Sequence, residues 1–263
     1  MSNTIDSAAR VSPRAHIGSG VSIGPFTIVE DGAVIGDGTG IAANALIGKG
    51  ARIGKNCKIH HGAIVGHEPQ DLKYAGEEST CEIGDRTVIR EYATLHRGTG
   101  QGGRTIVGSD CFIMGYVHIA HDCILGNKII MANAAMMAGH CEVEDYVTIG
   151  GITPIHQFVR IGCHSMIGGG VRVPKDVPPY VLVGNVFQGL NSVGLRRRGF
   201  SPDILSALDR TYNLIYNSKL NVSQAVARIK EEESLATVSE VQHVLTFIEN
   251  SKRGIIGGPR SHR

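Results

Sequence analysis

The chain repeats a short pattern of hydrophobic and polar positions. An aliphatic residue returns at every sixth position from Ile5 to Val65, again from Ile83 to Leu95, and without interruption from Val107 to Val173. An α-helix repeats every 3.6 residues, so no helix has this period. A fixed period of this kind indicates a solenoid, in which each short repeat packs on its neighbours.

Other positions of the six-residue repeat are also restricted. The fifth position is small, as at Ala33 and Ala45, and it lies two residues before the next aliphatic residue. On a strand, two such side chains point to the same side, so we expect both positions to form the core, with a turn between them. The second position is often glycine, as at Gly36 and Gly108, which favours a tight turn where a Cβ atom would clash.

This pattern resembles the hexapeptide-repeat family over roughly residues 5–177. The resemblance implies a left-handed parallel β-helix of triangular section, with three repeats to a coil. The left hand comes from the resemblance, because the general rule for strand crossovers predicts the right-handed form. A doubly wound α/β fold is excluded, since no helical segment interrupts the repeats.

Two segments leave the repeat, at about residues 68–82 and 100–105. We expect both to be loops extruded from the solenoid, where function is commonly carried. Gly98, Gly100 and Gly103 in the second segment have the spacing of a dinucleotide fingerprint. Because a strand rather than a helix is expected to follow, we interpret this segment as a flexible loop.

The repeat ends at Pro178-Pro179 and gives way to helical spacing. Ser201-Pro202 predicts an N-cap followed by proline at the first helical position. Apolar residues then recur at helical spacing across residues 204–215, 222–229 and 241–248. We therefore expect a β-helix over residues 1–190 and a helical domain over residues 191–263 that ends in a loose tail from Gly254.

Composition narrows the function classes. The 263 residues include 26 Lys and Arg and 24 Asp and Glu, and the net charge of +2 does not favour nucleic-acid binding. Hydrophobic residues make up 42% but aromatic residues only 5%, so the core must consist of small aliphatic side chains. Six cysteines without a Cys-x-x-Cys pair argue against a disulfide framework and a zinc ribbon.

The sequence predicts a cytoplasmic protein without stable membrane insertion. The first sixteen residues lack a basic region followed by an apolar stretch, and no run reaches the roughly 18 apolar residues of a membrane span.

Histidines gather in one part of the repeat. All ten in this region avoid the first and fifth positions, so we expect none of them to be buried in the core. Residues 18 apart stack about 4.8 Å apart on successive coils. This places His121, His140 and His156 in one column, with His118 at the adjoining corner and Gly139 directly above His121. A histidine poised as a base beside an open glycine N–H has the two groups that acyl transfer needs.

Seven motifs sharpen this picture: Gln70–Gly76, His96–Thr99, His118–Cys123, Gly139-His140, His156–Phe158, Asp176–Tyr180 and Arg197–Phe200. Together they resemble the bacterial UDP-N-acetylglucosamine acyltransferases of lipid A biosynthesis, over essentially the whole chain. The resemblance implies transfer of an R-3-hydroxyacyl group from acyl carrier protein to the 3-hydroxyl of the UDP-sugar. It also implies a homotrimer with sites between neighbouring β-helices, direct attack without an acyl-enzyme, and no cofactor or metal.

The same resemblance implies the roles of individual residues. His121 would be the general base, Asp122 would position it, and the Gly139 N–H would bind the thioester oxyanion. Gly169 would limit the length of the acyl groove. The remaining residues would bind substrate: Asp71, Lys73 and His118 at the sugar or acyl group, His96 and His140 nearby, and His156, Gln157, Asn191 and Arg197 at the nucleotide and its phosphates.

Three alternatives stay open. Val193 stands where some family members carry glutamate, so the acceptor could be the 3-amino analogue of the sugar. Interface-zinc carbonic anhydrases share the fold, and His118, His121 and His140 could supply three nitrogens to zinc. A noncatalytic trimeric scaffold is the third possibility.

Overall fold

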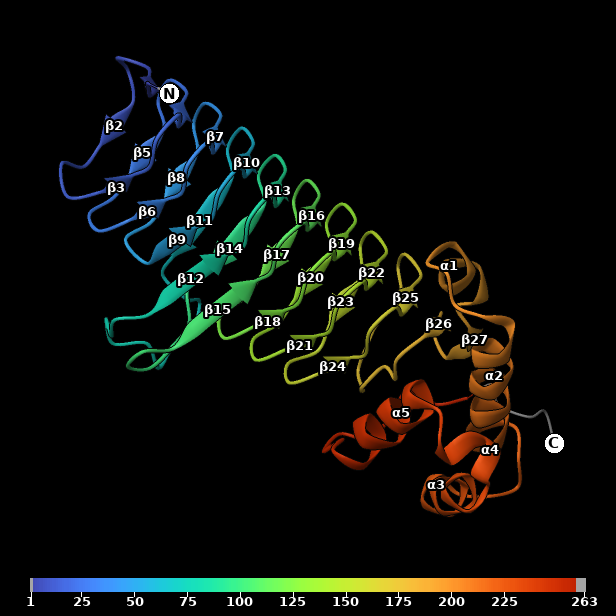
Figure 1. The fold of residues 1–263 in the computed structure, drawn as a ribbon. Coiled ribbons are helices and arrows are strands. Elements are labelled where there is room, and N and C mark those ends of the chain that lie inside the picture. The colour runs from blue at the N-terminus through green and yellow to red at the C-terminus, as the bar shows by residue number, and fades with distance from the viewer. Residues whose placement is uncertain (1, 259–263) are drawn as a thin grey trace.

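The computed structural model describes residues 2–258 and shows a left-handed parallel β-helix that leads into a group of helices (Figure 1). Most strands are two residues long, and each of three sheets takes every third strand along the β-helix. We call the turn from the first to the second sheet the first corner, the turn from the second to the third sheet the second corner, and the turn back to the first sheet the third corner.

The first sheet contains eleven strands among the described residues: β1 (Thr4–Ile5), β4 (Ser22–Ile23), β7 (Gly40–Ile41), β10 (Lys58–Ile59), β13 (Val88–Ile89), β16 (Phe112–Ile113), β19 (Ile130–Met131), β22 (Thr148–Ile149), β25 (Met166–Ile167), β26 (Val181–Val183) and β27 (Phe187–Leu190). The second sheet contains eight: β2 (Arg10–Val11), β5 (Ile28–Val29), β8 (Leu46–Ile47), β11 (Ile64–His67), β14 (Thr94–His96), β17 (His118–Ile119), β20 (Met136–Met137) and β23 (Pro154–Ile155). The third sheet also contains eight: β3 (His16–Ile17), β6 (Val34–Ile35), β9 (Ala51–Ile53), β12 (Thr80–Ile83), β15 (Arg104–Val107), β18 (Ile124–Leu125), β21 (Glu142–Val143) and β24 (Arg160–Ile161).

The predicted core positions are confirmed. Ile119 pairs with Met137, so one regular coil takes 137 − 119 = 18 residues. Both side chains and the fifth-position Ala135 have no exposed surface. Ile5 is 44% exposed because no coil precedes the first one.

The second-position glycines are needed where successive coils approach each other. A Cβ atom built on Gly36 would lie 2.6 Å from the carbonyl carbon of Gly54 in the next coil, so the predicted clash is confirmed. The left-handed backbone of the turn falls instead at the fourth position, where side chains occur. Asp122 and His140 adopt φ angles of +59° and +58° there.

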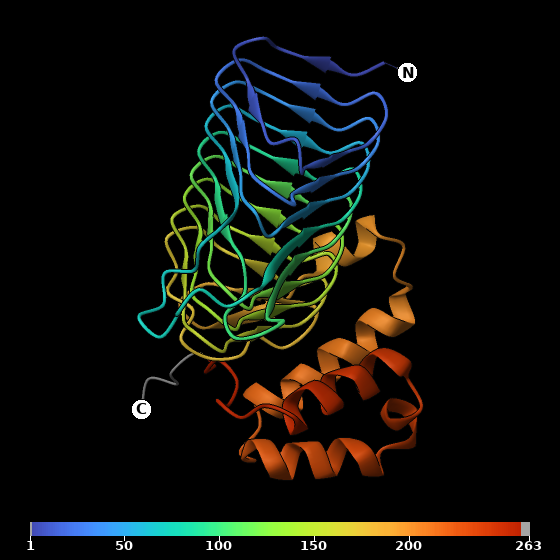
Figure 2. The same ribbon diagram turned by 90° about the vertical axis from the view of Figure 1, so that its left-hand side faces the viewer.

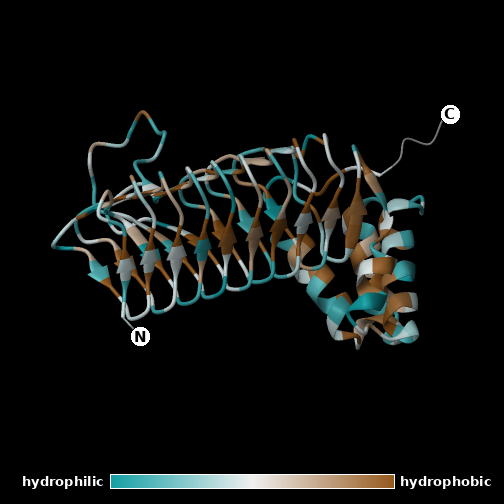
Figure 3. Cartoon of the chain, turned by 90° about the horizontal axis from the view of Figure 1, so that it is seen from above, coloured by the Kyte–Doolittle hydropathy of each residue, from teal (hydrophilic) through white to brown (hydrophobic). Residues whose placement is uncertain are grey.

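The two extruded loops stand off the second corner, where they project from one edge of the solenoid (Figures 2 and 3). Ile53 pairs with Ile83 and Ile83 pairs with Val107, so these coils take 30 and 24 residues rather than 18. The expected bounds were too long, because residues 80–82 and 104–105 belong to β12 and β15. Those strands pair with each other as soon as the chain returns, several residues before the aliphatic position.

The register changes after Pro178-Pro179, as predicted. Ile167 pairs with Val183, a step of 16 residues, and β27 then pairs antiparallel with β26. The helices follow: α1 (Ser192–Arg197), α2 (Pro202–Tyr216), α3 (Val222–Glu231), α4 (Glu233–Ala236) and α5 (Ser239–Glu249). The Ser201 N-cap is confirmed, since its hydroxyl accepts from the Ile204 N–H at 3.3 Å. Within the described part of the chain, no helix is long and apolar enough to cross a membrane.

The expected loose tail is partly wrong. Ile256 is 3% exposed, and its N–H donates to the Asp176 carbonyl at 2.8 Å, so burial of this side chain holds the segment against the β-helix. Residues 259–263 of that expectation lie outside the described residues.

Helix α5 also docks on the β-helix, through His243. Its Nδ1 lies 3.7 Å from Cys163 Sγ, and its Nε2 lies 3.0 Å from a Glu144 carboxylate oxygen. The Cys163 sulfur and the Glu144 carboxylate raise the pKa of His243 to about 10. The imidazole therefore bridges the two partners and fastens the helical domain to the third corner.

Candidate active site

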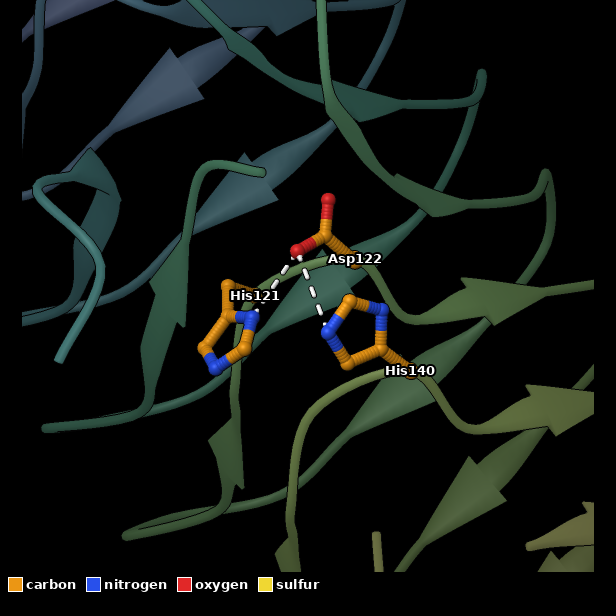
Figure 4. Close-up of side chains that lie close together, drawn as sticks. All are labelled: His121, Asp122 and His140. Carbon is orange, nitrogen blue, oxygen red and sulfur yellow. Dashed lines mark hydrogen bonds and ion pairs between the residues drawn. The ribbon is translucent and has the colours of Figure 1, made fainter. Parts of the chain in front are cut away.

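His121 and Asp122 follow β17 in the second corner (Figure 4). Neighbouring side chains on a strand point to opposite faces, but the left-handed backbone at Asp122 ends the strand geometry. Asp122 Oδ2 therefore lies 2.8 Å from His121 Nδ1. A carboxylate can only accept, so Nδ1 carries the proton and Nε2 keeps its lone pair, as a general base requires.

Thr99 holds the Asp122 carboxylate from the second loop. Its N–H lies 3.0 and 3.1 Å from the two carboxylate oxygens, and its hydroxyl donates to Oδ2 at 2.6 Å. Burial opposes ionisation of Asp122, but the hydrogen bonds from Thr99 and His121 outweigh it and lower the pKa below its ordinary value. Our sequence reasoning missed Thr99, although it is the last residue of the His96–Thr99 motif.

The inserted loop before β12 covers His121. His121 and His96 are only 7% and 6% exposed, so the expectation that these histidines are unburied is wrong. Both side chains point away from the core, as predicted, but the loop over residues 68–79 folds back across them. Asp71 Oδ2 from this loop lies 4.0 Å from His121 Nε2.

Gly139 lies one coil above His121, as predicted. A Cβ atom built on Gly139 would lie 2.5 Å from His121 Cε1, so the imidazole occupies the space a side chain would need. The Gly139 N–H donates to no acceptor among the described residues, whereas the next N–H, of His140, donates to the His121 carbonyl at 3.0 Å. The corner thus offers an open N–H beside an oriented base.

The other histidines of this region form aromatic contacts. His118 lies on β17 rather than at a corner, because it is the residue just before the aliphatic Ile119. Its Nδ1 is 2.8 Å from Thr94 Oγ1, and its ring meets His96 edge-on at 5.1 Å between centroids. Burial, followed by repulsion from neighbouring histidines, lowers the pKa of His96 to about 4, and burial also lowers that of His118. Both rings are therefore neutral near pH 7.

His140 completes the cluster from the coil above. Its Nε2 lies 3.8 Å from Asp122 Oδ2, and its ring stacks on Phe158 at 4.8 Å. His121, Asp122 and His140 are also close enough together to hold a metal ion. His118 is outside that group, so the three-histidine set considered for zinc is not brought together.

The remaining predicted residues lie farther along the chain or at other corners. His156 and Gln157 occupy the second corner two coils above His121, and Arg253 Nη2 lies 3.2 Å from His156 Nδ1. Asn191 caps α1 through Gly194 N and donates to the His164 carbonyl at 2.9 Å. Three residues are exposed: Lys73 in the first loop, Gly169 at the first corner and Arg197 in the last turn of α1.

Comparison with known proteins identifies the family. Residues 176–256 match the family described as UDP N-acetylglucosamine O-acyltransferase, domain 2, and residues 14–49 and 32–67 match the bacterial transferase hexapeptide repeats. A Burkholderia mallei protein named as an acyl-acyl-carrier-protein UDP-N-acetylglucosamine O-acyltransferase is 45% identical over 197 residues, which cover 73% of this chain and 75% of that protein. A Burkholderia lata protein of the same name is 46% identical over the same shares.

Solved structures agree over nearly the full length. The Francisella novicida UDP-N-acetylglucosamine acyltransferase is 38% identical with a TM-score of 0.94, over 98% of this chain and 95% of that one. The Bacteroides fragilis enzyme is 44% identical with a TM-score of 0.93, over 95% and 99%. With a base, an orienting carboxylate and an open N–H at one corner, this chain belongs to the UDP-N-acetylglucosamine O-acyltransferase family.

Proposed function

We propose that this chain transfers an R-3-hydroxyacyl group from acyl carrier protein to the 3-hydroxyl of UDP-N-acetylglucosamine in the cytoplasm, as the first step of lipid A biosynthesis. Acyl carrier protein and the UDP-sugar are the substrates in the names of the relatives. The observation that carries the proposal is the pairing of His121, oriented by Asp122, with the open N–H of Gly139.

The proposed reaction needs no covalent enzyme intermediate. The sugar hydroxyl gives its proton to His121 Nε2 while its oxygen bonds to the thioester carbon. The carbonyl oxygen becomes an oxyanion that accepts from the Gly139 N–H. The tetrahedral intermediate then breaks its carbon–sulfur bond, and the departing thiolate takes the proton from His121. Asp122 stabilises the imidazolium between these steps.

Substrate contacts surround this corner in the proposed complex. Asp71 is placed by its loop beside His121 Nε2, and Lys73 follows it on the same turn. The residues expected to contact the sugar or acyl group are Asp71, Lys73, His96, His118 and His140. Those expected to hold the nucleotide are His156, Gln157, Asn191 and Arg197, where a guanidinium fork suits phosphate.

A homotrimer is part of the proposal. Phe26, Tyr116 and Ile152 are 67%, 62% and 69% exposed at the same position of the first corner, which forms an apolar edge along the solenoid. Such an edge favours association with further copies of the chain. Mixing His121→Ala protein with Arg197→Ala protein should restore activity if neighbouring chains share one site. An active monomer in sedimentation experiments would overturn the trimer.

Val193 favours a second candidate acceptor. It lies in α1 and is 55% exposed, where a glutamate in some relatives would bear on acceptor binding. The 3-amino analogue of the sugar would then be acylated to an amide. Mass spectrometry of products from each acceptor with several acyl carrier protein thioesters distinguishes the two.

His121→Ala tests the chemistry. We expect a folded protein whose kcat falls on the order of 10²–10⁴, the usual contribution of a general base. His16→Ala, at an exposed histidine on β3, is the matched control and should keep full activity. Near wild-type turnover by folded His121→Ala protein would contradict the proposal and favour a scaffold.

A further inference from the structure

Arg97 is a buried arginine between the two inserted loops. It is 8% exposed and directly precedes Gly98 and Thr99. Its Nη2 donates to the Tyr74 hydroxyl and lies 3.5 Å from a Glu68 carboxylate oxygen. The guanidinium carbon also lies 5.4 Å from the centre of the Tyr74 ring. One side chain therefore contacts two residues of the first loop.

The backbone beside Arg97 connects to both ends of that loop. The Arg97 N–H donates to the His67 carbonyl at 3.0 Å, and the Gly98 N–H donates to the Thr80 carbonyl at 3.1 Å. The next residue, Thr99, holds the Asp122 carboxylate. A displacement of this segment would consequently reach the dyad within two residues.

Tyr74 connects Arg97 to the other partner of His121. The Tyr74 N–H donates to the Asp71 carbonyl at 3.0 Å, and Asp71 Oδ1 accepts from the Lys73 N–H at 2.9 Å. This turn is the part of the loop that brings Asp71 Oδ2 within 4.0 Å of His121 Nε2. The hydroxyl of Tyr74 thus anchors the turn to the corner.

We propose that Arg97 is a positioning residue, which sets the Asp71–Lys73 turn and the Thr99–Asp122 contact relative to each other across His121. The inference rests on the proposed function, because it assumes that catalysis occurs at His121. Arg97 itself touches no reacting atom. Its planar fork reaches Tyr74 and Glu68 together, which a lysine ammonium on a flexible stem would not reproduce.

A cavity of about 300 Å³ adjoins this arginine. Arg97, Ser79, Lys49 and Arg52 contribute to its lining, and Arg97 Nε and Ser79 Oγ are buried without a partner. Removing the Arg97 side chain would extend this space into the position of the guanidinium. A small guanidinium ion could then enter the same place.

The two arms of Arg97 predict different kinetic defects. Tyr74→Phe removes only the anchor of the substrate loop, so KM should rise several-fold while kcat changes little. Thr99→Val removes only the hydroxyl that holds Asp122, so kcat should fall while KM changes little. Arg97→Ala and Arg97→Lys disturb both arms and should lower kcat/KM on the order of 10², as expected for a misplacement near 1 Å.

Arg86→Ala is the matched control. Arg86 makes a two-pronged contact with Asp110 at the third corner, with both distances at 2.7 Å, and lies outside the proposed site. Its loss should leave kcat and KM unchanged. Millimolar guanidinium should restore part of the Arg97→Ala activity, whereas urea at the same concentration should not.

These measurements separate the inference from the proposed function. Active, folded His121→Ala protein would remove the proposed function itself. Inactive His121→Ala together with wild-type kinetics in Arg97→Ala would overturn the role of Arg97 alone. If Arg97→Ala does not fold, the conservative Tyr74→Phe and Thr99→Val variants decide: opposite KM and kcat defects support the role, and unchanged kinetics in both overturn it.

Discussion

The second and third corners use the same six-residue turn but treat its free N–H groups differently. At the third corner, a side chain of the next coil accepts the N–H of the third position: Ser19 by Asp37, Lys55 by Asp85, Ser109 by Asn127 and Asn127 by Asp145. At the second corner the third positions are His121 and Gly139, and the Gly139 N–H has no acceptor among the described residues. A capped donor stabilises the solenoid, whereas an open one remains available to a ligand.

Gly139→Ala should break this difference most strongly. The new methyl group would lie 2.5 Å from His121 Cε1, so the imidazole would have to move. We expect kcat to fall on the order of 10². Gly115→Ala is the control, because Gly115 holds the same position at the first corner and its nearest contact would be an ordinary 3.4 Å. Equal kinetics for the two variants would contradict the proposed role of Gly139.

Gly169→Met sharpens the comparison at the first corner. Gly170 has the left-handed φ of +69°, while Gly169 has none, and a Cβ on Gly169 would come no closer than 3.2 Å to Gly151 O. We expect the optimum to move to shorter acyl donors, since each methylene that finds apolar surface contributes about 0.8 kcal/mol, or roughly fourfold in kcat/KM. Assays over a series of donor lengths at constant oligomer content measure this. A uniform loss at every length would instead favour a structural role in the turn.

Asp145→Ala tests the capped corner. Asp145 Oδ1 accepts from the Asn127 N–H at 2.7 Å. Its loss should lower the free energy of unfolding by about 1 kcal/mol, as for other side-chain caps, and leave kcat unchanged. Urea unfolding and steady-state assays measure the two effects. Asp145→Asn keeps an accepting oxygen and should recover most of the stability; a large loss of kcat in either variant would argue against the division between the corners.

His96→Asn should produce the smallest effect, on the pH dependence of stability. Burial and neighbouring histidines lower the pKa of folded His96 to about 4, against about 6.5 in the unfolded chain. The unfolded state therefore binds the proton first, and stability falls as pH decreases from about 6.5 towards 4. The variant should lose less stability between pH 7 and pH 5 than the wild type in thermal unfolding. An identical loss would indicate that His96 stays neutral in both states.

The repeat was predictable because side-chain direction on a strand is local. Ile119 and Ala135 could be assigned to the core from spacing alone, and the Ser201 cap from two adjacent residues. The burial of His121 was not predictable, because it depends on where the 68–79 loop folds back. Thr99 and Arg97 were missed for the same reason: no period or spacing tells which distant side chain an extruded loop will meet.

Both insertions leave and re-enter the solenoid at one corner, and the strands on either side keep their pairing. The framework therefore sets no fixed length for these loops, provided that their ends return to the same corner. A loop of another length and sequence could be exchanged between β11 and β12 without refolding the coils. Natural selection could likewise rewrite what the second corner recognises by changing a segment whose folding the rest of the chain does not depend on.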